Sequence, residues 1–108
     1  MYSSSLARYV AVGSQGLIVT HEKADTGTTW TQQTSGVTGN ITGVTWDATN
    51  SQFIACVSGT NTFLKSTDGL TWTTVTVPIS LNWTGVSFST ALGKYVAVAP
   101  GSNVIISP

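Results

Sequence analysis

Charged residues are scarce in this sequence: its 108 residues include four Lys or Arg, four Asp or Glu and one His. With no basic patch to neutralise phosphates, nucleic-acid binding is not expected. The lone cysteine, Cys56, cannot form an internal disulfide, so packing has to stabilise the fold. No stretch reaches the ~20 apolar residues of a membrane span. Residues 1–5 show neither the basic nor the apolar segment of a signal peptide, so none is expected.

The abundant residues are Thr, Ser, Gly and Val, which favour strands and turns over helices. Short strand-like segments alternate with polar turns, as at 9–13, 17–20, 30–34 and 41–46. We therefore expect an all-β fold.

The most informative stretch is a tight polar turn at 66–72 (STDGLTW), and a related form occurs at 25–30 (DTGTTW). A carboxylate at the start of a hairpin loop can accept hydrogen bonds from backbone N–H groups one to three residues on. Glycine supplies the positive φ that closes such a turn. The Thr and Trp that follow suit a half-buried strand, where the Trp can fill the gap between two packed sheets.

Both stretches resemble the Asp-box, or BNR repeat, whose pattern is roughly Ser-x-Asp-x-Gly-x-Thr-Trp. Asp-boxes cap hairpins on the blades of sialidase-like and related β-propellers, including phage and bacterial surface proteins. In the second copy Gly69 follows the Asp directly, and in the first copy Lys23 stands where Ser is expected. The resemblance implies a structural role for the matching residues. These are Asp25, Gly27, Thr29, Trp30, Ser66, Asp68, Gly69, Thr71 and Trp72.

A repeat of 42 to 44 residues covers nearly the whole chain. The two Trp of the motif are 42 residues apart, and the distance from Trp30 to Phe53 equals that from Trp72 to Tyr95, at 23 residues. Four short strands at this period are typical of a four-stranded antiparallel propeller blade. We therefore predict a single partial β-propeller domain over 1–108, with repeats at about 9–52 and 53–94 and a partial repeat at 95–108.

This arrangement amounts to about two and a half blades per chain, whereas propellers need ~4–8 blades to close a ring. Open faces and edges are an aggregation hazard. We therefore expect a homo-oligomer in which several chains close one ring, with a dimer preferred. The alternative is an exchange of terminal strands between subunits.

The sequence predicts no enzyme. Sialidase chemistry, by resemblance, requires an arginine cluster and a Tyr/Glu pair, but the chain has one Arg, Arg8, and one Glu, Glu22. His21 precedes Glu22, and neighbours on a strand point to opposite faces, so we interpret this run as a solvated hairpin tip. Cys56 aligns with Val12 and Val98, which predicts a buried, inert thiol. No motif suggests a metal or cofactor site.

The four Trp residues differ in their expected roles. Trp30 and Trp72 belong to the Asp-box stretches and are expected in the core, as is Trp46, which aligns with Phe88. Trp83 has no aromatic counterpart in the repeat. It could stack on a sugar ring or fill an interface between blades, and we prefer packing because Trp is usually buried.

Two functions remain open at this stage. The first is a non-catalytic oligomeric β-propeller that serves as a structural or recognition module, for example in a phage particle or at a bacterial cell surface, as the resemblance implies. The alternative is a carbohydrate-binding lectin with sites between blades or on the propeller face. Repeated weak sites would then gain avidity.

Overall fold

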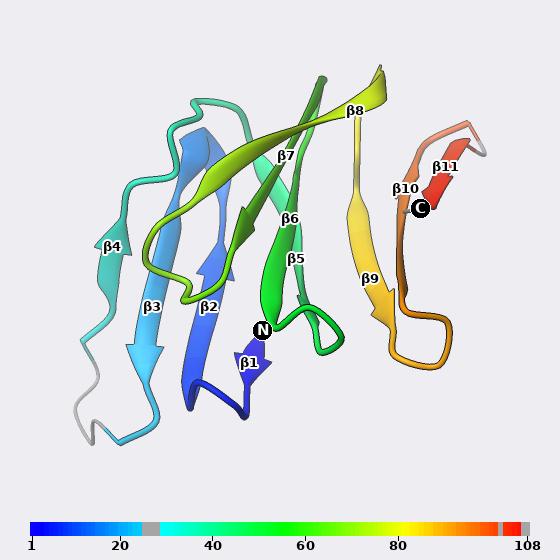
Figure 1. The fold of residues 1–108 in the computed structure, drawn as a ribbon. Coiled ribbons are helices and arrows are strands. Elements are labelled where there is room, and N and C mark those ends of the chain that lie inside the picture. The colour runs from blue at the N-terminus through cyan, green and yellow to red at the C-terminus, as the bar shows by residue number, and fades with distance from the viewer. Residues whose placement is uncertain (25–28, 102, 107–108) are drawn as a thin grey trace.

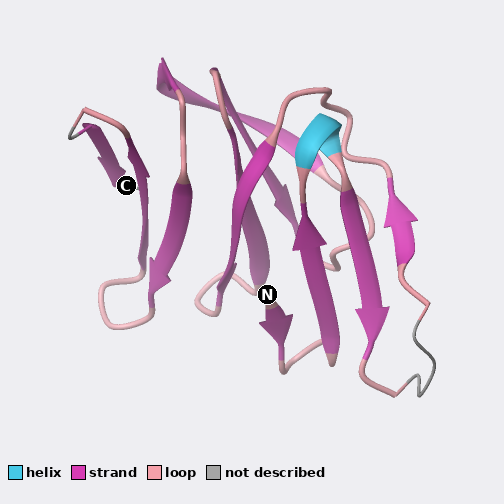
Figure 2. Cartoon of the chain, turned by 180° about the vertical axis from the view of Figure 1, so that it is seen from behind, coloured by secondary structure: helices cyan, strands magenta, loops and turns pink. Residues whose placement is uncertain are grey.

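The computed structural model of the chain describes residues 1–24 and 29–101 together with the backbone of 103–106 (Figure 1). Within this part, the secondary structure consists of β-strands and one 3₁₀ turn, η1 (Ser14–Gly16) (Figure 2). The all-β prediction is confirmed. No helix in the described residues is long and apolar enough to cross a membrane.

The described strands form three antiparallel sheets, in each of which the strands are neighbours in chain order. The first sheet contains β1 (Tyr2–Ser3), β2 (Arg8–Val12), β3 (Ile18–Glu22) and β4 (Thr31–Gln33). The second sheet contains β5 (Ile41–Asp47), β6 (Gln52–Val57), β7 (Thr60–Ser66) and β8 (Thr73–Leu81). The third sheet contains β9 (Gly85–Ser89), β10 (Lys94–Ala99) and β11 (Asn103–Ile106). The three sheets follow one another across the molecule (Figure 1). Each full repeat contributes its last strand to the next sheet: β5, within the repeat at 9–52, belongs to the second sheet, and β9, within the repeat at 53–94, belongs to the third.

The sheets share one register at their first hairpin. In each, an aromatic residue near the end of the first strand pairs directly with an aromatic residue near the start of the second. The pairs are Tyr2 with Tyr9, Trp46 with Phe53, and Phe88 with Tyr95. Directly opposed aromatic side chains stabilise a strand pair, and here they fix the same alignment three times.

Among the described residues, the core consists of two hydrophobic clusters, one between the first and second sheets and one between the second and third. Strand β6 contributes to both because its side chains alternate between the two faces of the sheet. Phe53 and Ala55 belong to the first cluster, whereas Ile54 and Cys56 belong to the second. The second sheet is therefore covered on both faces, and Cys56 is fully buried, as its position in the repeat predicts.

The expected core position of Trp30 is wrong. Its side chain is 44% exposed, whereas that of Trp72, at the same repeat position, is 8% exposed. Trp72 packs in the cluster between the first and second sheets. Trp30 lies beside Tyr9 and His21 on the opposite side of the first sheet, where no other sheet of the described chain packs. Trp46 packs against the margin of the first cluster.

Candidate functional site

The stretch that resembles the Asp-box forms the turn between β7 and β8. Oδ1 of Asp68 accepts hydrogen bonds from the backbone N–H groups of Leu70 at 2.8 Å and Thr71 at 3.0 Å. The hydroxyl of Ser66 also donates to Oδ1 at 3.0 Å and itself accepts the N–H of Gly69 at 2.7 Å. The backbone N–H groups of Thr71 and Leu70 lower the pKa of Asp68, because these bonds favour the ionised carboxylate. The carboxylate thus closes its own hairpin.

Gly69 fits this turn into the space between two sheets. Its φ is +80°, a conformation that suits glycine. A Cβ atom here would lie 3.2 Å from Cγ2 of Val10 in the first sheet and 3.3 Å from Cε2 of Phe53. The indole nitrogen of Trp72 donates to the carbonyl oxygen of Gly69 at 2.8 Å. The turn is therefore anchored by its own Trp and seated against the preceding sheet.

Arg8 adds a polar link between the same two sheets. Its guanidinium donates a hydrogen bond to the backbone carbonyl oxygen of Asp68, and it forms an ion pair with Glu22 on the neighbouring strand β3. The Arg8 side chain is 17% exposed, so its charged group is paired within the fold. Sequence reasoning missed this role because 60 residues separate Arg8 from its carbonyl partner.

The first copy of the motif is described only in part. Asp25 and Gly27 lie outside the described residues. Thr29 and Trp30 are exposed, and the backbone carbonyl of Thr29 lies 3.1 Å from Nδ1 of His21. The structure therefore places two of the predicted residues of this copy at an open surface.

Aromatic rings gather around Trp30 on the first sheet. Its ring centroid lies 5.2 Å from that of His21 and 6.4 Å from that of Tyr9, and the rings of Tyr2 and Tyr9 are 4.6 Å apart. We call this surface, formed by Tyr2, Tyr9, His21 and Trp30, the outer aromatic face. Glu22 bonds with Arg8 instead, so His21 and Glu22 point to opposite sides of the sheet, as the sequence predicts.

Trp83 lies in the second hydrophobic cluster and has no exposed surface. Its indole nitrogen donates to the carbonyl oxygen of Thr60 at 3.0 Å, and its ring meets that of Phe63 edge-on at a centroid distance of 5.3 Å. No face of the ring is available to stack on a sugar in this structure. The geometry favours the packing interpretation of Trp83.

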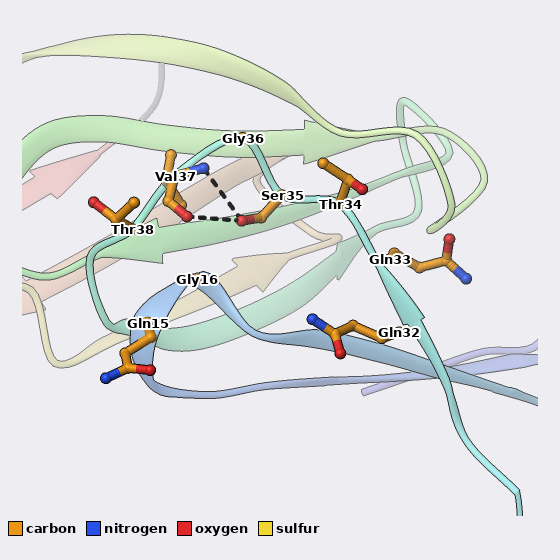
Figure 3. Close-up of a pocket in the computed structure, with 9 residues that line it drawn as sticks. All are labelled: Gln15, Gly16, Gln32, Gln33, Thr34, Ser35, Gly36, Val37 and Thr38. Atoms are coloured by element: carbon orange, nitrogen blue, oxygen red, sulfur yellow. Dashed lines mark hydrogen bonds between the residues drawn. The ribbon is translucent and has the colours of Figure 1, made fainter.

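A polar cavity of about 480 Å³ lies between the η1 turn, β4 and the loop that follows β4 (Figure 3). The described residues that line it carry no charge, and its polar side chains come from Gln15, Gln32, Gln33, Thr34, Ser35 and Thr38. Two of these side chains form hydrogen bonds within the fold. Nε2 of Gln33 donates to Oγ1 of Thr20 at 3.0 Å, and the Ser35 hydroxyl bonds with both backbone groups of Val37 (Figure 3).

Gln15 and Gln32 are exposed at this cavity. Side-chain amides both donate and accept hydrogen bonds, which suits a neutral polyhydroxyl ligand. Sequence reasoning did not identify this cavity, since its residues are common types brought together from segments 15–16 and 32–38.

In the described part of the chain, no group of three or more His, Cys, Asp or Glu side chains is arranged to hold a metal ion. No protein-family model matches the chain, and no curated protein matches it as a relative. The resemblance to the Asp-box therefore depends on the residues of the two motif stretches and on the repeat.

Proposed function

We propose that the chain is a non-catalytic structural or recognition module of the Asp-box propeller type, which assembles with copies of itself. In this proposal each sheet is a propeller blade, residues 1–108 form one partial propeller domain, and several chains close the ring. The shared register of the three sheets and their arrangement in series support blades of one kind.

The observation that carries the proposal is that the Asp68 carboxylate accepts hydrogen bonds from its own loop. Its Oδ1 accepts three hydrogen bonds from its own loop, and the loop is seated on the first sheet through Gly69 and Arg8. A carboxylate bound in this way holds a hairpin in place, and its three bonds occupy Oδ1 within the loop.

Three other charged side chains, Asp47, Arg8 and Glu22, support the same proposal because each has a local partner. Oδ1 of Asp47 accepts the backbone N–H groups of Thr49 and Asn50, both at 3.0 Å. Arg8 and Glu22 bind each other. A catalytic site requires a nucleophile or base that converges with a second functional group, and these residues are dispersed over separate hairpins.

Substitution of Asp68 tests the structural role against a role in ligand binding. Asp68→Ala should lower stability without abolishing any specific binding of the folded protein. The measurement pairs chemical denaturation with a binding screen on a broad glycan array. A fully stable Asp68→Ala protein that has lost binding would overturn the structural assignment.

The lectin alternative is favoured by one observation, the uncharged cavity beside Gln15 and Gln32. Amide and hydroxyl groups can satisfy the hydroxyls of a neutral sugar, and several copies in an assembly would add avidity. Saturable binding on the array that free sugar competes away, and that the double variant Gln15→Ala/Gln32→Ala loses, would support this function. Thr76→Ala, at an exposed position on β8 away from the cavity, is the matched control. Silence across the array would refute the lectin.

A further inference from the structure

The chain contains two interfaces between neighbouring sheets. In both, the second strand of each sheet contributes side chains with the same alternation. Between the second and third sheets, Tyr95 and Ala97 of β10 pack in one cluster with Ile54 and Cys56 of β6. Between the first and second sheets, Phe53 and Ala55 of β6 pack in one cluster with Val10 and Val12 of β2. The second strand of each sheet therefore presents one set of residues to the preceding sheet and the alternate set to the following sheet.

The two outer sheets each expose one half of such an interface. Tyr9 is 38% exposed, whereas its equivalent Phe53 is fully buried. Val98 is 44% exposed, whereas its equivalent Cys56 is fully buried. The first sheet lacks a preceding sheet among the described residues, and the third lacks a following one. Trp30 is exposed, whereas its equivalent Trp72 is buried, so Trp30 belongs to the open half on the first sheet.

The two open halves match because β2 and β10 contain the same four residues, Tyr-Val-Ala-Val, at 9–12 and 95–98. In β10, the Tyr and the Ala face the second sheet, and Ala97 is fully buried there. In β2, the two Val side chains face the second sheet, and Val10 is fully buried there. The Tyr and Ala side chains, which are open on β2, are thus the ones that face another sheet on β10. The two Val side chains, which are open on β10, are the ones that face another sheet on β2.

We propose that a second copy of this chain docks the outer side of its third sheet, through Val96 and Val98, on the outer aromatic face of the first copy. The contact is head-to-tail and repeats the sheet-to-sheet packing inside each chain. This inference depends on the proposed self-association and specifies the surfaces that carry it. A head-to-tail contact closes into a ring or continues as a filament, depending on the rotation between copies.

A second copy fits this surface better than an unrelated partner. The outer aromatic face includes Tyr9 and Trp30, and Ala11 follows Tyr9 on the same side of β2. The same residue types pack against the preceding sheet elsewhere in the chain, as Tyr95 and Ala97 on β10 and as Trp72 just before β8. Exposed apolar surface of this kind marks an interaction site. The surface complementary to it is already present on the third sheet of the same molecule.

Two charge substitutions, each at one open half, test the docking. Ala11→Asp places a carboxylate on the first sheet, and Val98→Asp places one on the third. Both positions are exposed, so the substitutions should leave the fold intact. We expect the unmodified chain to be a multiple of the single-chain mass of 11.3 kDa by light scattering, and each variant to be monomeric.

A mixture of the two variants gives the sharpest result. The Ala11→Asp chain retains its third-sheet surface, and the Val98→Asp chain retains its first-sheet surface. Head-to-tail docking therefore predicts a one-to-one complex of about twice the single-chain mass in the mixture, although neither variant assembles alone. Native mass spectrometry of chains of different isotopic mass would identify the pair. A mixture that stays monomeric would overturn the proposal.

The controls separate this inference from the proposed function. Ile79→Asp replaces an exposed apolar side chain on β8 of the second sheet, which belongs to neither docking surface, and should leave the assembly unchanged. Circular dichroism checks that each variant folds, and Tyr9→Ser replaces Ala11→Asp if that variant does not. An unmodified chain that is monomeric at all concentrations would refute self-association as well as the docking. An assembly that survives both charge substitutions would refute only the docking surfaces.

Discussion

The indole nitrogen of Trp72 donates a hydrogen bond of 2.8 Å to the carbonyl oxygen of Gly69, three residues earlier in the same hairpin. The bond satisfies the polar atom of a side chain that is otherwise buried between two sheets. It also fixes the turn that the Asp68 carboxylate closes. One Trp therefore fills the interface and anchors the turn beside it.

Truncation of Trp72 should be severely destabilising. Trp72→Ala removes a buried aromatic side chain and is expected to cost about 3–5 kcal/mol in the free energy of unfolding. Trp72→Phe retains much of the apolar contact and loses the bond to Gly69, so it should cost less. Urea denaturation measures both. Trp30→Ala, compared in the Ala11→Asp background so that docking does not contribute, should change stability by only about 0.5 kcal/mol. Equal losses at the two Trp positions would contradict this.

The Asp68 carboxylate should make stability depend on pH in acid. Its pKa in the folded chain is lowered by the N–H groups of Thr71 and Leu70, so its contribution is fully present above the ordinary value of 3.8 and is lost as the pH falls through the folded value. Asp68→Asn retains an acceptor oxygen but does not titrate, and should reduce this acid dependence. Asp68→Ala should cost about 1–2 kcal/mol at neutral pH, because it removes the hydrogen bonds that close the turn.

Denaturation midpoints of the unmodified chain and Asp68→Asn, measured from pH 7 down to pH 3 and below, check this prediction. The difference between the two proteins should shrink as the carboxylate is protonated. Parallel curves over the whole range would show that the carboxylate has the same pKa in the folded and unfolded chains.

Gly43 sets how closely the first strands of the second and third sheets approach. A Cβ atom on Gly43 would lie 3.1 Å from the backbone nitrogen of Val86 and 3.2 Å from Cα of Gly85. Backbone atoms cannot yield as a flexible side chain can, so Gly43→Ala should cost about 1–3 kcal/mol. The matched control is Gly85→Ala, whose Cβ would meet only Cγ2 of Val98 at 3.9 Å. Thermal unfolding of the two variants should therefore differ, and equal stability would argue against the tight approach.

The sequence predicted the strands and the Asp68 turn because both are encoded locally, by alternation, turn residues and the repeat. The burial of Trp83 could also be predicted, since Trp83 aligns with the apolar residue Ile41 in the repeat. The link from Arg8 to the carbonyl of Asp68 could not be predicted, because it joins two repeats and no local sequence pattern indicates it. The exposure of Trp30 could not be predicted from its motif, because burial depends on the sheet that packs against it.

The Asp47 turn is an intermediate case. The run Asp-Ala-Thr-Asn at 47–50 indicates a turn, and the structure shows that the carboxylate is buried and accepts the N–H groups of residues 49 and 50. The sequence gives the turn residues, but the burial of the carboxylate follows from the packing around the hairpin.

Thiol labelling compares one repeat position in two environments and also reports on the proposed docking. Cys56 is fully buried, and burial raises the pKa of its thiol, so a maleimide reagent should modify it only when the chain opens.

A Cys56→Val/Val98→Cys variant moves the thiol to the equivalent, exposed position on the third sheet. In dilute solution this thiol should react rapidly, and at concentrations that favour assembly it should be protected, because the outer aromatic face of a second copy covers it. The Ile79→Cys/Cys56→Val variant should react rapidly at every concentration, because Ile79 is exposed on β8 of the second sheet and lies outside the docking surfaces. Protection of both thiols would indicate nonspecific aggregation, and protection of neither would leave the third sheet without a partner.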